Sequence, residues 1–371
     1  MESRAGEGPE SFGQWLKEWV AAHPGAQILG LVEAWSQLEA GAQGGNVAAL
    51  YSQRAILKRW EYLLASEGWR PLLNLPLTLL WGSPLVHSLS PYLHNTWNER
   101  LPAAAGLYLP SLLQVPLDPS LLARLDDWPI LGANVTHPYK GELLPLLADL
   151  GGWDLEVELI GGGNTLWRSQ GSWAGANTDP GGWRRAWLSA GGGYLKGRQI
   201  TIWGAGGAAS SLVYLALREG AEQITIINAP PRAQKLLEWW RRGKWGDKLG
   251  RDTLWQTAPQ RLQAPREGEI WWQATPCGQW PALGKSLYPW PAPPARPLEG
   301  FEVGDLIYNP PQSAFLEGAR GWANLRLNGW RMLLEQALAA RQLWLGDLIP
   351  APQLNSAPEL LALTPSPWGS A

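Results

Sequence analysis

The sequence predicts an α/β protein of two domains, preceded by a helical extension. Short apolar runs alternate with helical segments from about residue 77 onward, which is typical of parallel sheets. A glycine-rich turn follows one of these runs and opens a helix. The chain of 371 residues is long enough for two domains of ordinary size.

Five apolar runs are predicted to form buried strands because they are short and bounded by turn residues. They are residues 77–81, 200–203, 223–228, 269–274 and 303–308. A helix is expected between the second and third runs, and another over residues 143–150.

Tryptophan is unusually frequent, with 26 Trp against 3 Phe and 9 Tyr. Trp81, Trp203 and Trp271 stand within predicted strands, where another large apolar residue would serve equally well. We therefore interpret these tryptophans as core filling rather than as an aromatic binding surface.

The first 75 residues are predicted to form a helical extension without chemistry of its own. In residues 46–69 the apolar positions recur at helical spacing; they are Leu50, Leu57, Trp60 and Leu64. Residues 350–371 are expected to form a loosely held tail.

Composition excludes several classes of protein. The 30 Lys and Arg nearly balance the 32 Asp and Glu, which argues against a nucleic-acid partner. The polar start of the chain is not a secretory signal, and no apolar stretch approaches the ~20 residues of a membrane span. Because Cys277 is the single cysteine, no internal disulfide is possible, and we expect a cytoplasmic protein. We also expect no membrane partner, and a monomer or homodimer.

The glycine-rich turn has the pattern G-x-G-x-x-A between a predicted strand and a predicted helix. It reads Gly204, Ala205, Gly206, Gly207, Ala208 and Ala209. Gly204 permits the tight turn, Gly206 lets the backbone approach a pyrophosphate, and Ala209 keeps the helix close to the sheet. The N-terminus of the helix offers N–H groups to the phosphates. The motif therefore predicts a Rossmann-like dinucleotide-binding domain.

The end of the next strand bears on which dinucleotide is bound. A carboxylate there would hold the ribose hydroxyls of NAD, but the chain reads Asn228-Ala-Pro-Pro-Arg232, with Lys235 shortly after. Arg232 and Lys235 can pair with a 2′-phosphate, which favours NADP and leaves NAD open.

Upstream, clusters of Ser, Thr and Asn side chains match a small hydroxylated carboxylic acid. They contain Ser88, Ser90, Asn134, Thr136, Asn164, Thr165, Asn177 and Thr178. Lys140 and Asp179 lie in the same clusters and are the groups that can pass a proton while a hydride moves.

These motifs make the chain resemble the shikimate dehydrogenase family over about residues 77–349. The matching segments, in the family's order, are WGSPLVHSLSPYLHN, GANVTHPYKGELLPLL, GGGNT, GANTDPGG, WGAGGAA, QATPCG, DLIYNP and NGWRMLLEQA.

The resemblance implies a role for individual residues. Ser88, Ser90 and Tyr308 would hold the substrate carboxylate, and Thr136 would add a polar contact. Lys140 and Asp179 would form the catalytic pair. Asn164 and Gln336 would bind ring hydroxyls. Helical periodicity places Gln336 on an apolar face, where its amide needs a partner, either a ligand hydroxyl or a backbone group.

The resemblance also implies a domain organisation: a helical extension (1–75), a substrate-binding α/β domain (76–180, completed by a helix at about 326–349), an NADP-binding Rossmann domain (181–325) and a tail (350–371). The implied activity is the reversible NADPH-dependent reduction of 3-dehydroshikimate to shikimate in aromatic amino acid biosynthesis. An NAD-using quinate/shikimate dehydrogenase and a non-catalytic shikimate-binding or regulatory module stay open.

The chain departs from the family's pattern on the cofactor side. Ala229 and Pro230 replace the Arg and Thr that usually follow Asn228, and Gln273 and Gln279 replace an Asn and a Met. Residues for metal binding are not expected, because the histidines His87, His94 and His137 come without a ligand pattern. A Ser–His nucleophile lacks its usual turn motif, and Cys277 is expected to be an inert thiol.

Overall fold

The structure is a computed structural model that describes residues 54–56, 58–59, 76–85, 87–99, 105–111, 122–123, 126, 129–148, 152–243, 254–257, 264–279, 287, 289–292 and 294–346. The extension predicted for residues 1–75 lies outside these ranges except for residues 54–56, 58 and 59, which are helical. The predicted tail over 350–371 also lies outside them. Within the described part of the chain, no helix is long and apolar enough to cross a membrane.

The described residues divide into two compact units. The first takes the chain up to Gly152, then Asn164–Gly175, and the end of the last helix from Ala340. The second takes Trp153–Gly163 and Ala176–Ala339.

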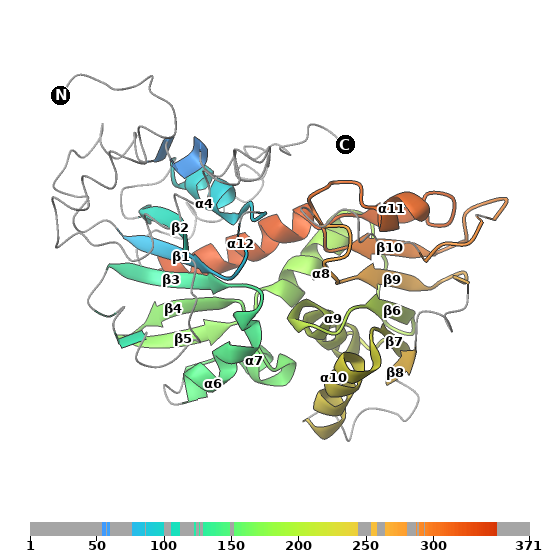
Figure 1. Ribbon diagram of the computed structural model, residues 1–371, viewed down its shortest axis with the longest axis horizontal. Helices are drawn as coiled ribbons and strands as arrows, with labels where there is room; N and C mark the ends of the chain where they lie inside the picture. The colour runs from blue at the N-terminus through green and yellow to red at the C-terminus, as the bar shows by residue number, and fades with distance from the viewer. Residues whose placement is uncertain are drawn as a thin grey trace. The chain divides into compact units, whose positions relative to one another are not determined.

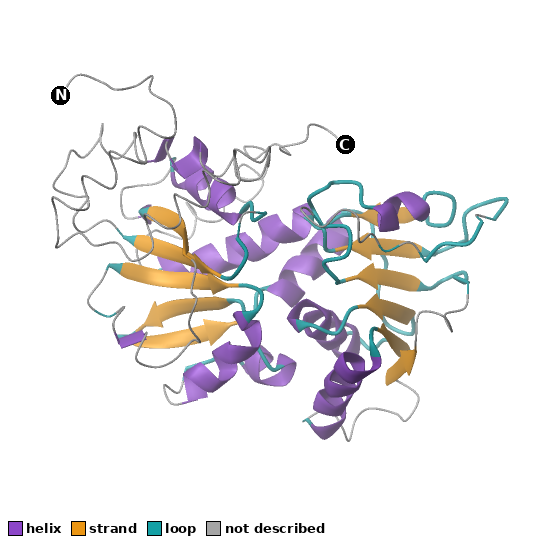
Figure 2. Cartoon of the chain, in the orientation of Figure 1, coloured by secondary structure: helices purple, strands orange, loops and turns teal. Residues whose placement is uncertain are grey.

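The first unit is built on a five-stranded sheet with the order β2-β1-β3-β4-β5 (Figures 1 and 2). Its strands are β1 (Leu77–Trp81), β2 (Leu107–Ser111), β3 (Ile130–Val135), β4 (Thr165–Ser169) and β5 (Ser172–Ala176). Strand β1 pairs in parallel with β2 and β3, and all five of its residues are buried, as expected for a strand that is covered on both faces. Its helical segments are α4 (Ser90–Asn98), η4 (Tyr139–Glu142) and α6 (Leu143–Ala148).

The sheet of this unit is parallel at β2, β1 and β3, as the sequence predicts, but β4 runs antiparallel to β3. A two-residue turn at Gln170 and Gly171 joins β4 to β5, with φ angles of 50° and 82°. Positive φ at both turn residues is what a tight hairpin requires. Gln170 lacks the Asn or Gly signal that normally marks such a turn, and the hairpin was therefore not found from the sequence.

The second unit is built on a six-stranded sheet with the order β11-β10-β9-β6-β7-β8, in which every pair is parallel. Its strands are β6 (Gln199–Trp203), β7 (Gln223–Ile227), β8 (Leu254–Thr257), β9 (Ile270–Gln273), β10 (Glu302–Asp305) and β11 (Leu325–Leu327). Its helices are α7 (Leu155–Ile160), α8 (Asp179–Ser189), α9 (Gly207–Arg218), α10 (Pro230–Arg242) and α11 (Ala314–Gly318). The order is that of the Rossmann fold, with its reversal point between β6 and β9.

Both faces of the second sheet are packed with tryptophan. Side chains alternate along β9, so Trp271 and Trp272 point to opposite faces. Trp272 meets Trp183 and Trp187 of α8 at ring-centroid distances of 5.9 and 5.6 Å. Trp271 stacks on Trp290 at 5.1 Å.

The interpretation of the tryptophans as core residues is confirmed at the positions singled out above. Trp81, Trp203 and Trp271 are 1%, 3% and 1% exposed.

The last helix, α12 (Trp330–Leu345), contributes to both units, since the division falls between Ala339 and Ala340. The sequence predicts the boundary between the two domains ahead of this helix. It also predicts that the helix begins at about residue 326, where the structure has β11. The boundary falls within α12 because its first half packs against α8, where a Cβ on Gly182 would lie 2.9 Å from the backbone nitrogen of Gln336. Its second half joins the first unit, in which Trp344 donates to the carbonyl of Leu166 at 2.8 Å.

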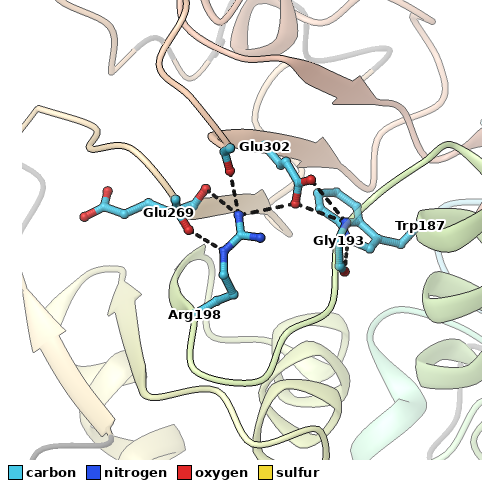
Figure 3. A network of polar contacts seen from close by, with 7 residues as sticks. Trp187, Gly193, Arg198, Glu269 and Glu302 are labelled. Atoms are coloured by element: carbon cyan, nitrogen blue, oxygen red, sulfur yellow. Dashed lines mark hydrogen bonds and ion pairs between the residues drawn. The ribbon is translucent and has the colours of Figure 1, made fainter.

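One arginine holds together the loops at the amino ends of β9 and β10 (Figure 3). The Arg198 guanidinium donates to the carbonyls of Gly268, Glu269 and Gly300, the last two at 3.4 and 2.6 Å. It also pairs with the Glu302 carboxylate at 3.4 Å, which in turn accepts from a backbone N–H of the segment before β6. Planar donors in a fixed fork suit such convergent acceptors.

We expect Arg198→Ala to lower the free energy of unfolding by about 1–3 kcal/mol, because the part-buried acceptors of Gly268, Glu269 and Glu302 lose their donor at once. Urea unfolding followed by tryptophan fluorescence measures this. Arg320→Ala removes an exposed i,i+3 pair and serves as the control, with a change of about 0.5 kcal/mol or less. Equal effects of the two substitutions would contradict the stabilising role of Arg198.

Candidate functional site

In the first unit, predicted substrate residues follow the carboxyl ends of β1 and β3. These ends are joined because Thr136 N–H donates to the Trp81 carbonyl at 2.8 Å and Ser83 N–H donates to the His137 carbonyl at 3.0 Å. Strand β4 is antiparallel, so its first residues lie at the same end, and Val135 N–H donates to the Asn164 carbonyl at 2.8 Å. The sheet thus brings three separate polar motifs to one place.

Ser88 and Ser90 lie where the loop after β1 enters α4. Both are buried, and the Ser90 N–H donates to Ser88 Oγ at 3.2 Å. No side chain caps the start of this helix. Buried hydroxyls beside helical N–H groups suit a carboxylate ligand.

Thr136 and Lys140 come from the segment after β3. Thr136 precedes a turn in which the Tyr139 N–H donates to its carbonyl at 2.9 Å, and Lys140 lies in the short helix η4. Both side chains are partly exposed. Lys140 therefore stands close to the sheet end with access to solvent.

Asn164 is 3% exposed and lies directly ahead of β4. Its Oδ1 accepts a hydrogen bond from Thr165 Oγ1 at 2.9 Å. The Asn164 side chain, which is predicted to bind a ring hydroxyl of the substrate, is thus held by Thr165, its neighbour in sequence.

The glycine-rich turn of the second unit has the features that its motif predicted. Gly204 adopts φ +128°, and a Cβ there would lie 2.9 Å from the Ala274 carbonyl, so only glycine fits. A Cβ on Gly206 would meet nothing within 4 Å, and no side chain caps the start of α9. Ala209 is fully buried where α9 packs on the sheet. The space and the uncapped helix fit a pyrophosphate.

The loop after β9 lies next to this turn at the reversal point of the sheet. Ala274 N–H donates to the Trp203 carbonyl at 2.7 Å, just ahead of the glycines. Gln273, which replaces the family's Asn, is fully buried, accepts from the Thr275 N–H and donates to the Cys277 carbonyl at 3.2 Å. The longer side chain therefore spans and orders this loop.

The segment after β7 differs from a usual phosphate-binding end. Asn228 Oδ1 accepts from the Ala229 N–H at 2.6 Å, and the next two residues are prolines without N–H groups. The N–H groups of Arg232 and Ala233 both donate to the Ala229 carbonyl at 3.2 Å. The exposed side chains of Arg232 and Lys235 are therefore the groups here that suit a 2′-phosphate.

Asp179 and Gln336 lie on two helices that touch. Asp179 begins α8 and is 4% exposed, and its N–H donates to Asn177 Oδ1 at 3.1 Å. Gly182, one turn later, packs directly against Gln336 on α12. Gln336 is buried and its Nε2 donates to the Leu333 carbonyl at 2.9 Å.

The contact between α8 and α12 is fixed by an ion-pair network. Glu335 pairs with Arg185 at 3.0 Å and with Arg331 at 2.8 Å, although it is only 8% exposed. Two arginines compensate the burial of one carboxylate.

Tyr308 follows β10 in a segment held by the buried acid Asp305, for which the sequence predicts no role. Asp305 accepts from the Ile307 N–H at 2.9 Å and from the Ser313 hydroxyl. Burial raises the pKa of the Asp305 carboxyl from 3.8 to about 7. Its signal in the sequence is the position itself, since an acid that ends an apolar strand run is buried.

The structure thus gathers Ser88, Ser90, Thr136, Lys140 and Asn164 in the first unit, and Asp179, Tyr308, Gln336 and the cofactor residues in the second. Lys140 and Asp179 belong to different units, so their pairing stays a prediction. In the described part of the chain, no three His, Cys, Asp or Glu side chains form a group that could hold a metal ion.

Comparison with known proteins identifies the family. The family model for the shikimate dehydrogenase substrate binding domain matches residues 80–166. The shikimate dehydrogenase (NADP(+)) of Methanothermobacter thermautotrophicus is 31% identical over 76% of this chain and 95% of its own length. The chain belongs to the shikimate dehydrogenase family. The resemblance inferred from the ordered motifs is confirmed, as is the two-domain α/β fold class.

Solved structures agree with this assignment. The shikimate 5-dehydrogenase of Listeria monocytogenes, in complex with shikimate and NAD, is 26% identical, with a TM-score of 0.59 over 77% of this chain and 96% of that one. The enzyme of Thermus thermophilus, in complex with NADP(H) and shikimate, is 27% identical, with a TM-score of 0.56 over 77% and 99%.

We expect the stability of the protein to depend on the ionisation of Asp305. The folded protein holds this proton up to about pH 7, whereas the unfolded chain releases it near pH 3.8. The stabilisation from the raised pKa is therefore complete below the unfolded value and is lost as the pH rises through the folded one.

Asp305→Asn keeps a neutral side chain that accepts from Ile307 and donates to Ser313. The midpoint of thermal unfolding of the wild type should fall relative to this variant between about pH 4 and pH 7. Parallel profiles of the two proteins would show that Asp305 does not titrate in this range.

Proposed function

We propose that this protein is an NADP-dependent shikimate dehydrogenase that reversibly reduces 3-dehydroshikimate to shikimate, in the route to aromatic amino acids. The carrying observation is the gathering of Ser88, Thr136, Lys140 and Asn164 at one end of the first sheet. The chain supplies this set within a family whose similar members are named shikimate dehydrogenase (NADP(+)).

The substrate-binding roles follow from the chemistry of each side chain. The hydroxyls of Ser88, Ser90 and Tyr308 suit the carboxylate, and Thr136 adds a polar contact. The amides of Asn164 and Gln336 suit ring hydroxyls, because an amide offers both donors and an acceptor.

Lys140 carries the proton in the proposed reaction. When bound, NADP supplies the hydride donor or acceptor at its nicotinamide. During reduction the Lys140 ammonium gives a proton to the substrate oxygen as the carbonyl becomes a hydroxyl, and during oxidation the amine takes it back. Asp179 would orient Lys140 toward the substrate oxygen.

The second unit supplies the proposed cofactor site. The turn from Gly204 to Ala208 and the start of α9 fit the pyrophosphate, and the loop ordered by Gln273 lies beside them. Asn228 and Arg232 would face the adenosine ribose and its phosphate. We expect the enzyme to work in the cytoplasm as a monomer or homodimer.

An NAD-using quinate/shikimate dehydrogenase is the second candidate, and the start of α10 favours it. Ala229 replaces a cation there, two prolines lack N–H groups, and the nearby backbone donors are bonded within the helix. The preference for the 2′-phosphate then rests on the exposed side chains of Arg232 and Lys235. Steady-state rates with NADP and NAD, each with shikimate and with quinate, separate the two candidates.

We expect Lys140→Ala to lower kcat for shikimate oxidation about 10²- to 10⁴-fold with a much smaller change in KM, because proton transfer acts in the transition state. Lys196→Ala, which alters an exposed lysine of the second unit, is the control and should keep wild-type kcat. An unchanged kcat for Lys140→Ala would remove the proposed role.

We expect Arg232→Ala to raise the KM for NADP about tenfold and to leave the KM for NAD unchanged, since only NADP carries the 2′-phosphate. Arg242→Ala, at the far end of the same helix, is the matched control. Loss of affinity for both cofactors alike would place Arg232 outside the phosphate site.

A further inference from the structure

A chain of buried hydrogen bonds runs across the first sheet to Asn164. Tyr108 on β2 donates through its hydroxyl to Asn134 Oδ1 on β3 at 2.8 Å. Asn134 Nδ2 reaches Thr165 Oγ1 on β4 at 3.2 Å, and Thr165 Oγ1 reaches Asn164 Oδ1 at 2.9 Å. None of these four residues is more than 5% exposed.

The direction of this chain is set by a backbone carbonyl. The terminal atom of Asn134 that faces Thr165 also lies 3.2 Å from the Asn164 carbonyl oxygen, which can only accept. That terminal atom must therefore be the amide nitrogen of Asn134. Its oxygen consequently faces Tyr108, which must donate.

The same reasoning fixes the next step. Because Thr165 Oγ1 accepts from Asn134, its own proton points to the Asn164 side chain. The atom of Asn164 at that contact must be the oxygen, which directs its amide nitrogen the other way. The orientation of the Asn164 amide is thus decided by Asn134 and Thr165, which lie within the family's motifs, and by Tyr108, which lies outside them.

Tyr108, at which this series of hydrogen bonds begins, is itself held firmly. Its ring stacks on His94 at 4.1 Å with an interplanar angle of 14°. Its N–H donates to Asn95 Oδ1 at 3.0 Å and its carbonyl accepts from Asn95 Nδ2 at 2.7 Å. A phenol clamped on both ring and backbone can act as a fixed donor.

We propose that Tyr108 and Thr165 are positioning residues that turn the Asn164 amide so that its nitrogen donates to a ring hydroxyl oxygen of the substrate. The inference rests on the proposed function and deepens it. It predicts selectivity for an acceptor oxygen at this point of the ring, because a rotated amide would present its own acceptor instead.

The test compares Tyr108→Phe and Thr165→Val with the wild type in steady-state kinetics at saturating NADP. Each variant removes one hydroxyl and keeps the shape of the side chain. We expect each to raise the KM for shikimate about 2- to 10-fold, the worth of one hydrogen bond, and to leave the KM for NADP unchanged. Thr165→Ser, which keeps the hydroxyl, should restore wild-type KM, and Tyr194→Phe, an exposed tyrosine, is the matched control.

Two further measurements separate positioning from a merely structural role. Two shikimate analogues are compared, each of which lacks one of the ring hydroxyls that do not react. The analogue that lacks the contacted hydroxyl should bind the wild type more weakly than shikimate does. It should lose much less affinity for Thr165→Val. The double variant that combines Tyr108→Phe with Thr165→Val should have a shikimate KM no higher than that of Thr165→Val alone. The reason is that the hydrogen bonds from Tyr108 reach Asn164 only through Thr165.

The proposal is overturned if the KM for shikimate stays at the wild-type value in either single variant, if the KM for NADP rises equally, or if the two effects multiply. A wild-type protein without shikimate-dependent reduction of NADP or NAD would instead defeat the proposed function, and the positioning role with it. If the wild type turns over shikimate and both variants keep the wild-type KM for shikimate, only the positioning role is defeated.

Discussion

The parallel alignment of strands is the constraint on which the candidate site depends. Parallel strands that share a sheet end at the same side, so the loops that follow them meet there. In the first unit this joins the segments after β1 and β3, and the antiparallel β4 adds Asn164 at its beginning. In the second unit it joins the glycine turn after β6 with the loops after β9 and β10. Residues far apart in sequence thereby become neighbours.

Buried polar side chains then give these loops their shape. Asp305 holds the segment before Tyr308, and Gln273 holds the loop after β9. Asn134 plays the same part in the first unit. A buried polar group without a partner is costly, so each of these side chains strongly favours one arrangement of its loop. Such preorganisation suits a site that must bind a ligand with many hydroxyls.

The departures from the family's pattern have different consequences on the cofactor side. The replacement of Asn by Gln at position 273 is accommodated, since the longer amide still bonds to the loop backbone at two points. The change after Asn228 is not compensated in the backbone, because prolines begin α10. The exposed cations Arg232 and Lys235 are left as the groups that are proposed to discriminate between the two cofactors.

The sequence by itself determined the fold class, the strands β6, β7, β9 and β10 of the second unit and the glycine turn, but not the strands β8 and β11. These features follow from local periodicity and from residues such as Gly204 that tolerate special backbone angles. It also marked the polar motifs, whose side-chain chemistry needs no geometry to recognise. Tertiary structure alone decided the β4–β5 hairpin, the division within α12 and the hydrogen-bond chain from Tyr108 to Asn164. These depend on which distant segments pack together, and a buried tyrosine or threonine has no sequence pattern that reveals the partner across the sheet.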